Sequence, residues 1–116
     1  MKKFQFVVLA LVLGAFVIAS CGDDDTTTSF DCTDVTFSNV LEPLIASRCA
    51  LPACHDAGSP NGDYTTYATL LPNLDNGRVR VRVLDEMTMP PTGAIALTQT
   101  ELDQFECWLD DGHPEN

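Results

Sequence analysis

The stretch Cys49-Ala50-Leu51-Pro52-Ala53-Cys54-His55 places two thiols and an imidazole directly after a segment with helical periodicity. Apolar residues of that segment recur on one helical face, at Val40, Leu41, Leu44 and Ile45. Asn39 followed three residues later by Glu42 is a capping-box pattern. We therefore predict a helix from Asn39 to about Cys49, with Cys54 and His55 in the loop that follows.

A cysteine pair followed directly by histidine is the arrangement that covalent haem attachment requires. Both thiols add to the haem vinyl groups, and the histidine binds the iron. The usual spacing is C-x-x-C-H, whereas four residues intervene here, a spacing also known among c-type haem sites. In an exported protein Cys49 and Cys54 could instead form a disulfide. Zinc bound by both cysteines, His55 and His113 fits no usual ligand spacing.

The region after His55 contains turns and two short predicted elements. Residues 56–63 are rich in Gly, Pro, Asn and Asp, which is typical of turns, and their spacing fits no EF-hand. We expect a short helix from Tyr64 to Leu71, stopped by Pro72. Residues 78–84 alternate as a strand would, although no second strand is available to pair with them.

The last helix has the clearest boundaries in the sequence. Thr98 and Glu101 form a capping box, and Gly112 with Pro114 marks its end. Its apolar residues share one face, at Leu102, Phe105, Trp108 and Leu109. Before this helix, the segment Met87-Thr88-Met89-Pro90-Pro91 holds thioethers in a loop stiffened by prolines, and a methionine can complete the coordination of a haem iron.

Taken in order, these segments resemble a small bacterial c-type cytochrome domain of the class I kind, over roughly residues 36–114. The shared pattern is a helix leading into C-x(n)-C-H, then M-P-P, then an L-T-x-x-E-L helix ending in W-L-x-x-G. The resemblance implies an all-α fold of three to four short helices around one covalently attached haem c. It makes Cys49 and Cys54 the attachment residues, His55 the proximal ligand and Met89 the distal ligand, with Met87 as the competitor. It also turns residues 77–83 into a short helix, which we prefer to the strand.

The chain begins with a pattern typical of bacterial lipoproteins. Lys2 and Lys3 precede the apolar run 6–19, which is short for a bilayer span and typical of a secretory signal. The run ends in Ile18-Ala19-Ser20-Cys21, which resembles a lipobox with Cys21 as the lipidated residue. An uncleaved anchor is the alternative. We expect a signal peptide at 1–20, an acidic tether at 21–35 and the cytochrome-like domain at 36–116. The protein would then be lipid-anchored in the cell envelope, on the periplasmic side or at the surface of the outer membrane.

Charge and cysteine content restrict the partners. A formal net charge of -11 and a pI near 4.1 argue against binding to nucleic acid or to anionic lipid.

The run Asp23-Asp24-Asp25 resembles a lipoprotein surface-export signal or is a solvated spacer. On a helical wheel, Cys107 lies opposite the apolar face of its helix, so we predict a disulfide between Cys32 and Cys107.

These patterns predict one-electron transfer by a low-spin haem. We expect a dry haem face from Leu44, Ile45, Leu70, Phe105 and Trp108, and an acidic surface that steers a basic redox partner. Arg78, Arg80 and Arg82 either pair with a haem propionate or belong to ordinary surface ion pairs. No general base or nucleophile is visible, so we expect no catalytic residues and no enzyme activity. The alternatives are a haem-free, disulfide-stapled surface binding module, or a haem sensor or peroxidase-like site with an open iron.

Overall fold

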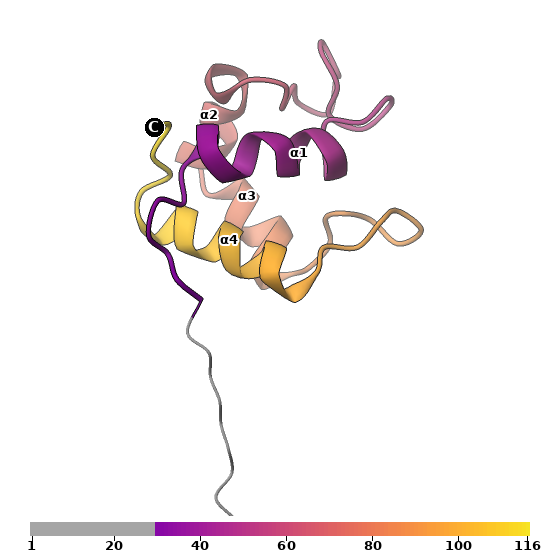
Figure 1. The fold of residues 1–116 in the computed structure, drawn as a ribbon. Helices are drawn as coiled ribbons and strands as arrows, with labels where there is room; N and C mark the ends of the chain where they lie inside the picture. Colours follow the sequence, from indigo (N-terminus) through magenta and orange to yellow (C-terminus); the bar gives the residue numbers. More distant parts are fainter. Residues whose placement is uncertain (1–29) are drawn as a thin grey trace, which may run out of the picture.

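The computed structural model describes residues 30–116, and over these residues the chain is helical without a strand (Figure 1). The elements are η1 (Phe37–Leu41), α1 (Glu42–Arg48), α2 (Tyr67–Asp75), α3 (Arg78–Arg80), η2 (Val81–Asp85) and α4 (Gln99–Asp110). The two π-helical segments, η1 and η2, are continuous with α1 and α3. The all-α prediction is confirmed for this part of the chain. The predicted signal peptide at 1–20, Cys21 and the run Asp23-Asp24-Asp25 lie outside the described residues.

The first helical segment begins earlier than its sequence pattern predicts. Thr36 has an extended backbone, and its hydroxyl accepts a hydrogen bond from the Asn39 N–H, so Thr36 is the N-cap. The predicted capping box at Asn39 and Glu42 is therefore wrong. The earlier start places Phe37 four residues before Leu41, and both side chains are buried in the core. That burial explains why the helix begins before the polar pair rather than at it.

Helix α2 also differs from the prediction at both ends. It begins after Thr66, which forms a capping box with Thr69, and it continues through Pro72 to Asp75. Pro72 has no N–H and so cannot donate to the carbonyl of Ala68, but this removes only one bond of the helix. Leu70 and Leu74 lie on either side of Pro72 and are both buried. Their packing explains why the helix passes the proline instead of stopping at it.

The segment with alternating valines is helical, so the strand is wrong and the short helix at 77–83 is the better prediction. Val79 and Val83 are each 6% exposed, whereas Val81 is 40% exposed. A strand would point all three valines to the same side, but a helix brings only positions four apart onto one face. The helical segment begins after Gly77, whose φ of 75° lies in the left-handed region that glycine adopts readily.

Helix α4 and the chain after it close the core. The capping box of Thr98 and Glu101 is present as predicted, and Gly112 has a φ of 81° just beyond the end of the helix. Phe105 and Trp108 are fully buried, and the Trp108 indole N–H donates to the carbonyl of Pro114 at 2.9 Å. The Pro114 carbonyl also accepts the Phe37 N–H at 2.9 Å. The C-terminal segment therefore ties α4 to the start of η1.

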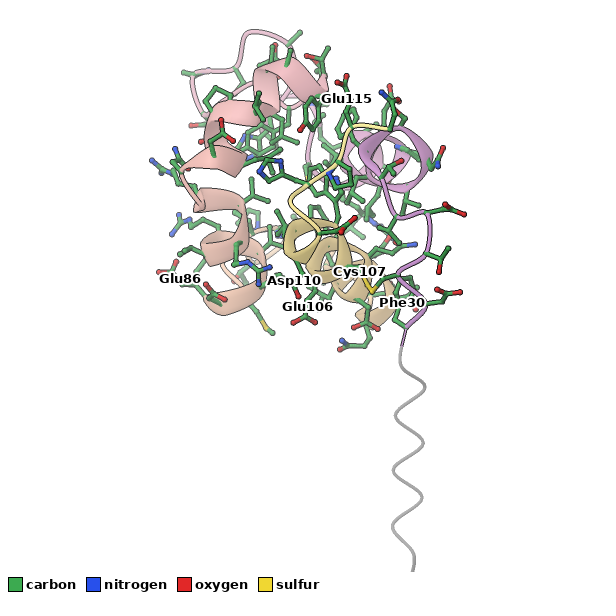
Figure 2. All side chains as sticks on the ribbon, turned by 90° about the vertical axis from the view of Figure 1, so that its left-hand side faces the viewer. Phe30, Glu86, Glu106, Cys107, Asp110 and Glu115 are labelled. Carbon is green, nitrogen blue, oxygen red and sulfur yellow. A yellow bond between two sulfur atoms is a disulfide. The ribbon has the colours of Figure 1, made fainter. Side chains whose placement is uncertain are left out.

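The N-terminal side of the described chain is held by the predicted disulfide. Cys32 and Cys107 are bonded, with their Cα atoms 5.4 Å apart, and Figure 2 shows the sulfur bond close to Phe30. Val35 belongs to the core and Phe30 packs against it. The packed region thus begins before residue 36, inside the segment predicted to be tether, because the disulfide and Val35 fasten this segment to the helices.

Two loops extend from the same side of the helices. The loop after α1 carries Cys54 and His55, and the loop before α4 carries Met89 (Figure 1). The two loops are far apart in the sequence, and only the packing of α1 against its neighbours brings them to one side. This arrangement positions the candidate site.

Candidate functional site

A cavity of about 680 Å³ lies between the two loops and the helices. This volume falls within the roughly 300–1,000 Å³ of typical cofactor and ligand sites. Four residues singled out from the sequence line it together: Cys49, Cys54, His55 and Met89. The structure therefore brings the candidate attachment cysteines and both candidate iron ligands to one cavity.

The loop that carries Cys54 and His55 closes on itself through backbone bonds. The Cys54 N–H donates to the Leu51 carbonyl at 2.9 Å, and the His55 N–H donates to the Cys49 carbonyl at 3.2 Å. Ala53 takes a left-handed conformation with a φ of 66°. The four residues between the cysteines therefore form a turn that returns His55 to the end of α1. This turn explains how the longer spacing still places both thiols at one site.

The imidazole of His55 is held in one tautomer by its neighbour. Its Nδ1 lies 3.0 Å from the carbonyl oxygen of Gly62. A carbonyl oxygen only accepts hydrogen bonds, so Nδ1 carries a proton, and in the neutral imidazole the lone pair then lies on Nε2. A bond of this kind from the remote ring nitrogen is what orients a metal-binding histidine. The structure therefore holds the His55 ring through Nδ1 and leaves Nε2 as the ring nitrogen without this bond.

Cys49 and Cys54 are both free thiols in the structure, so no disulfide joins them. Both side chains are half-buried. Burial raises the pKa of the Cys49 thiol to about 11, and the neighbouring Cys54 adds to the rise. Cys49 is therefore protonated at neutral pH, and the residue lines the cavity.

The two methionines of the loop before α4 differ in their surroundings. Met89 is half-buried, packs against the core and lines the cavity. Met87 is 68% exposed and does not line the cavity. The N–H groups of Thr88 and Met89 both donate to the Arg82 carbonyl, at 2.8 Å and 3.0 Å. This pair of bonds fastens the loop to η2 and turns Met89, rather than Met87, toward the site.

The apolar wall of the cavity contains only part of the predicted set. Ile45, Leu70 and Phe105 line the cavity as expected. Leu44 and Trp108 are buried in the core but do not line it. For Trp108 the reason is its position on α4, from which the indole reaches the C-terminal segment and bonds to Pro114. The prediction that Leu44 and Trp108 belong to the apolar wall of the cavity is therefore wrong.

Three of the described arginines line the cavity, and they differ in their partners. Arg48 pairs with Glu101 at 2.9 Å, and Arg82 pairs with Glu86 at 3.2 Å. Arg78 lines the cavity without a carboxylate partner within 4.0 Å among residues 30–116. Arg80 pairs with Asp110 instead and lines no part of the cavity. Surface ion pairing thus accounts for Arg80 and Arg82, while Arg78 remains available to an anionic group.

Sequence reasoning missed two residues of the site, Gly62 and Tyr64. The ring of Tyr64 stacks on that of His55, with the centroids 3.9 Å apart and the planes at 2°. The turn signals at 56–63 located the loop but gave no means of telling which carbonyl would face the imidazole. The sequence pattern places Tyr64 at the start of a helix, whereas α2 begins only after Thr66.

No known family, curated protein or solved structure matches this chain. No helix within residues 30–116 has the length and apolar character to cross a membrane. The same residues contain no group of three or more His, Cys, Asp or Glu side chains arranged to hold a metal ion. A haem iron needs no such group, because the protein supplies only its axial ligands.

Proposed function

We propose that this protein is a c-type cytochrome that transfers single electrons through one covalently attached haem. The observation that carries the proposal is the convergence of His55, Met89 and two free thiols on one cavity. These four side chains come from two loops that are separated in the sequence by two helical segments. An imidazole, a thioether and a pair of thiols at one cavity form the donor set of a haem c rather than of a zinc or calcium site.

The remaining walls of the cavity fit a planar apolar group that carries carboxylates. Ile45, Leu70 and Phe105 offer apolar surface to the faces of a macrocycle. Arg78 offers a guanidinium without a carboxylate partner in the described chain, and a guanidinium suits a propionate. The Arg48–Glu101 pair is already satisfied and holds two helices together instead.

Each residue has a definite task in this proposal. Haem supplies the iron that alternates between its ferric and ferrous states when bound. Cys49 and Cys54 would hold it through thioether bonds, each thiol adding across one vinyl group. His55, through Nε2, and Met89, through Sδ, would both bind the iron, which would leave no open coordination site for substrate chemistry. We therefore propose electron transfer rather than enzyme catalysis, with no catalytic residues.

The partner in this proposal is a redox protein with a basic docking face. The chain has 17 acidic and 6 basic residues, and Lys2 and Lys3 belong to the predicted signal peptide. Figure 2 shows Glu86, Glu106 and Glu115 projecting into solvent from different parts of the fold. Such a surface raises the association rate with a cationic partner, and the rate falls as salt is added. Lipidation at Cys21 would keep the protein in the cell envelope.

The proposed function is tested by making the full chain together with a cytochrome c maturation system. We expect a coloured protein, one haem in the intact mass and a haem stain that survives denaturation. A colourless protein with both Cys49 and Cys54 open to alkylation would contradict the proposal and favour a haem-free surface binding module.

The axial ligand is tested by a matched pair of methionine variants. Met89→Ala should lower the reduction potential and abolish the absorption that signals sulfur ligation, since methionine raises the potential of haem iron. Met87→Ala should behave as the native protein does, because that side chain is exposed and lies outside the cavity. The reverse pattern would assign the ligand to Met87. No effect from either variant would indicate an open iron, as in a sensor or a peroxidase-like site.

A further inference from the structure

The parallel stack of His55 and Tyr64 differs from the other aromatic contacts of the described residues. Those contacts have interplanar angles of 35° to 67°. The His55 and Tyr64 rings are 2° from parallel with centroids 3.9 Å apart. In this arrangement one face of the imidazole lies against the phenol ring, and the contact restrains the imidazole only if the surroundings also hold the tyrosine in place.

The backbone around the two rings supplies that restraint. The Tyr64 N–H donates to the His55 carbonyl at 3.0 Å, which pairs the two residues directly. Between them, the Gly62 carbonyl accepts from the imidazole. A Cβ on Gly62 would lie only 3.1 Å from Cε1 of Tyr64, so the tyrosine ring packs closely against the backbone of Gly62, whose φ of 105° favours glycine. The imidazole is thus restrained at Nδ1 by Gly62 and on one face by Tyr64.

These two restraints act on different motions of the imidazole. A single hydrogen bond at Nδ1 selects the tautomer but still permits the ring to rock about the line to its acceptor. A parallel ring against its face opposes that rocking, because rotation of the imidazole would drive its edge into the phenol ring. The orientation of the lone pair on Nε2 therefore depends on the stack as well as on the hydrogen bond.

We propose that Tyr64 is a positioning residue that fixes the plane of the His55 imidazole and so aims Nε2 at the bound iron. This inference rests on the proposed haem function, and it concerns the aromatic ring of Tyr64 rather than its hydroxyl. The hydroxyl has no hydrogen-bond partner among residues 30–116, and burial raises the pKa of the phenol, so it stays protonated at neutral pH. The ring alone is sufficient for the stack.

The test compares Tyr64→Phe, which keeps the ring, with Tyr64→Leu, which removes it. Tyr67→Phe is the matched control: Tyr67 does not line the cavity, and its hydroxyl donates to the His113 carbonyl at 2.9 Å. In the haem-free protein, nitrogen NMR reports the tautomer of His55 and the mobility of its ring. In the haem-loaded protein, the ferric EPR spectrum and the reduction potential report the orientation of the axial imidazole. Tyr64→Met replaces Tyr64→Leu if the latter fails to fold.

We expect Tyr64→Leu to increase the mobility of the His55 ring in the haem-free protein, to broaden the EPR signal and to shift the potential, while Tyr64→Phe and Tyr67→Phe match the native protein. Native behaviour of Tyr64→Leu would overturn the proposal. So would a change in Tyr64→Phe equal to that in Tyr64→Leu, since the hydroxyl would then be responsible, or an equal change in Tyr67→Phe, which would indicate general loosening. If the proposed haem function is wrong, the native protein made with the maturation system will be colourless. The NMR comparison of the haem-free native and variant proteins still decides whether Tyr64 restrains the His55 ring.

Discussion

Arg48 at the end of α1 and Glu101 in the first turn of α4 form an ion pair in which both Nε and a terminal nitrogen of the guanidinium lie 2.9 Å from Oε1 of the carboxylate. The other carboxylate oxygen accepts the Thr98 N–H at 2.7 Å. One carboxylate therefore caps α4 and joins it to the helix that leads into Cys49. Both side chains are largely buried, so this pair is better shielded from solvent than the ion pairs of Arg80 and Arg82.

Glu101→Gln should destabilise the protein by about 1–2 kcal/mol, because it removes the charge that Arg48 and the helix N-terminus bind. Denaturant unfolding measures the loss. Glu106→Gln is the control, since Glu106 is exposed on the same helix. The Thr98 N–H, followed by Arg48, lowers the pKa of Glu101. The stabilisation by the Glu101 carboxylate is therefore present above the pKa of Glu101 in the unfolded chain, and it is lost as the pH falls through the lower pKa of the folded protein. The unfolding free energies of the Glu101→Gln and Glu106→Gln proteins should therefore converge in acid. Equal unfolding free energies of the Glu101→Gln and Glu106→Gln proteins at neutral pH would contradict the stabilising role of Glu101.

Removing the disulfide with Cys32→Ser and Cys107→Ser together should cost about 4 kcal/mol, since the bridge spans 75 residues. The expected result is a lower unfolding midpoint, measured against the native protein without reductant. Adding reductant to the native protein should reproduce the loss. A double variant as stable as the native protein would show that Phe30 and Val35 hold the N-terminal segment without the bond.

The valines of α3 and η2 distinguish the helix from a strand. Val79→Ala and Val83→Ala should each cost about 2 kcal/mol, because each removes buried methyl groups from the core. Val81→Ala should change stability by less than about 0.5 kcal/mol, because Val81 is 40% exposed and lies off the buried face of the helix. Denaturant unfolding of the three variants gives the comparison. Equal losses at all three positions would favour the strand.

The thiol of Cys49 should react slowly with iodoacetamide in haem-free protein. With a pKa of about 11, its thiolate population at neutral pH is about two orders of magnitude below that of an unhindered cysteine. The Cys54→Ala variant isolates this reaction, which should accelerate about tenfold per pH unit until the pKa is approached. Because the unfolded thiol ionises near 9.0, this group should also reduce folding stability as the pH rises from there toward 11. A peptide-like rate at neutral pH would show that Cys49 is exposed in solution.

Local signals were reliable where they are complete within a few residues. The capping box of Thr98 and Glu101 is present because its bonds form inside a single turn. The pairing of Cys32 with Cys107, 75 residues apart, was predicted from two positions: the side of the helix on which Cys107 lies and the place of Cys32 just before the first helix. Asn39 and Pro72 misled for the opposite reason. Both carry strong local preferences, and in each case burial of neighbouring apolar residues, Phe37 or Leu74, determined the helix boundary instead.

The sequence by itself determined the chemistry available to this protein, because residue types and their spacing are local properties. It supplied the Cys49, Cys54 and His55 cluster, the methionine loop and the acidic charge. Only the tertiary structure decided which groups meet. It placed the Gly62 carbonyl and the Tyr64 ring against the imidazole, and it turned Met89 inward and Met87 outward. It also left Arg78 without a carboxylate partner among residues 30–116. These choices depend on contacts between segments far apart in the chain, and no local pattern encodes which backbone atom or ring will lie against a side chain once the helices have packed.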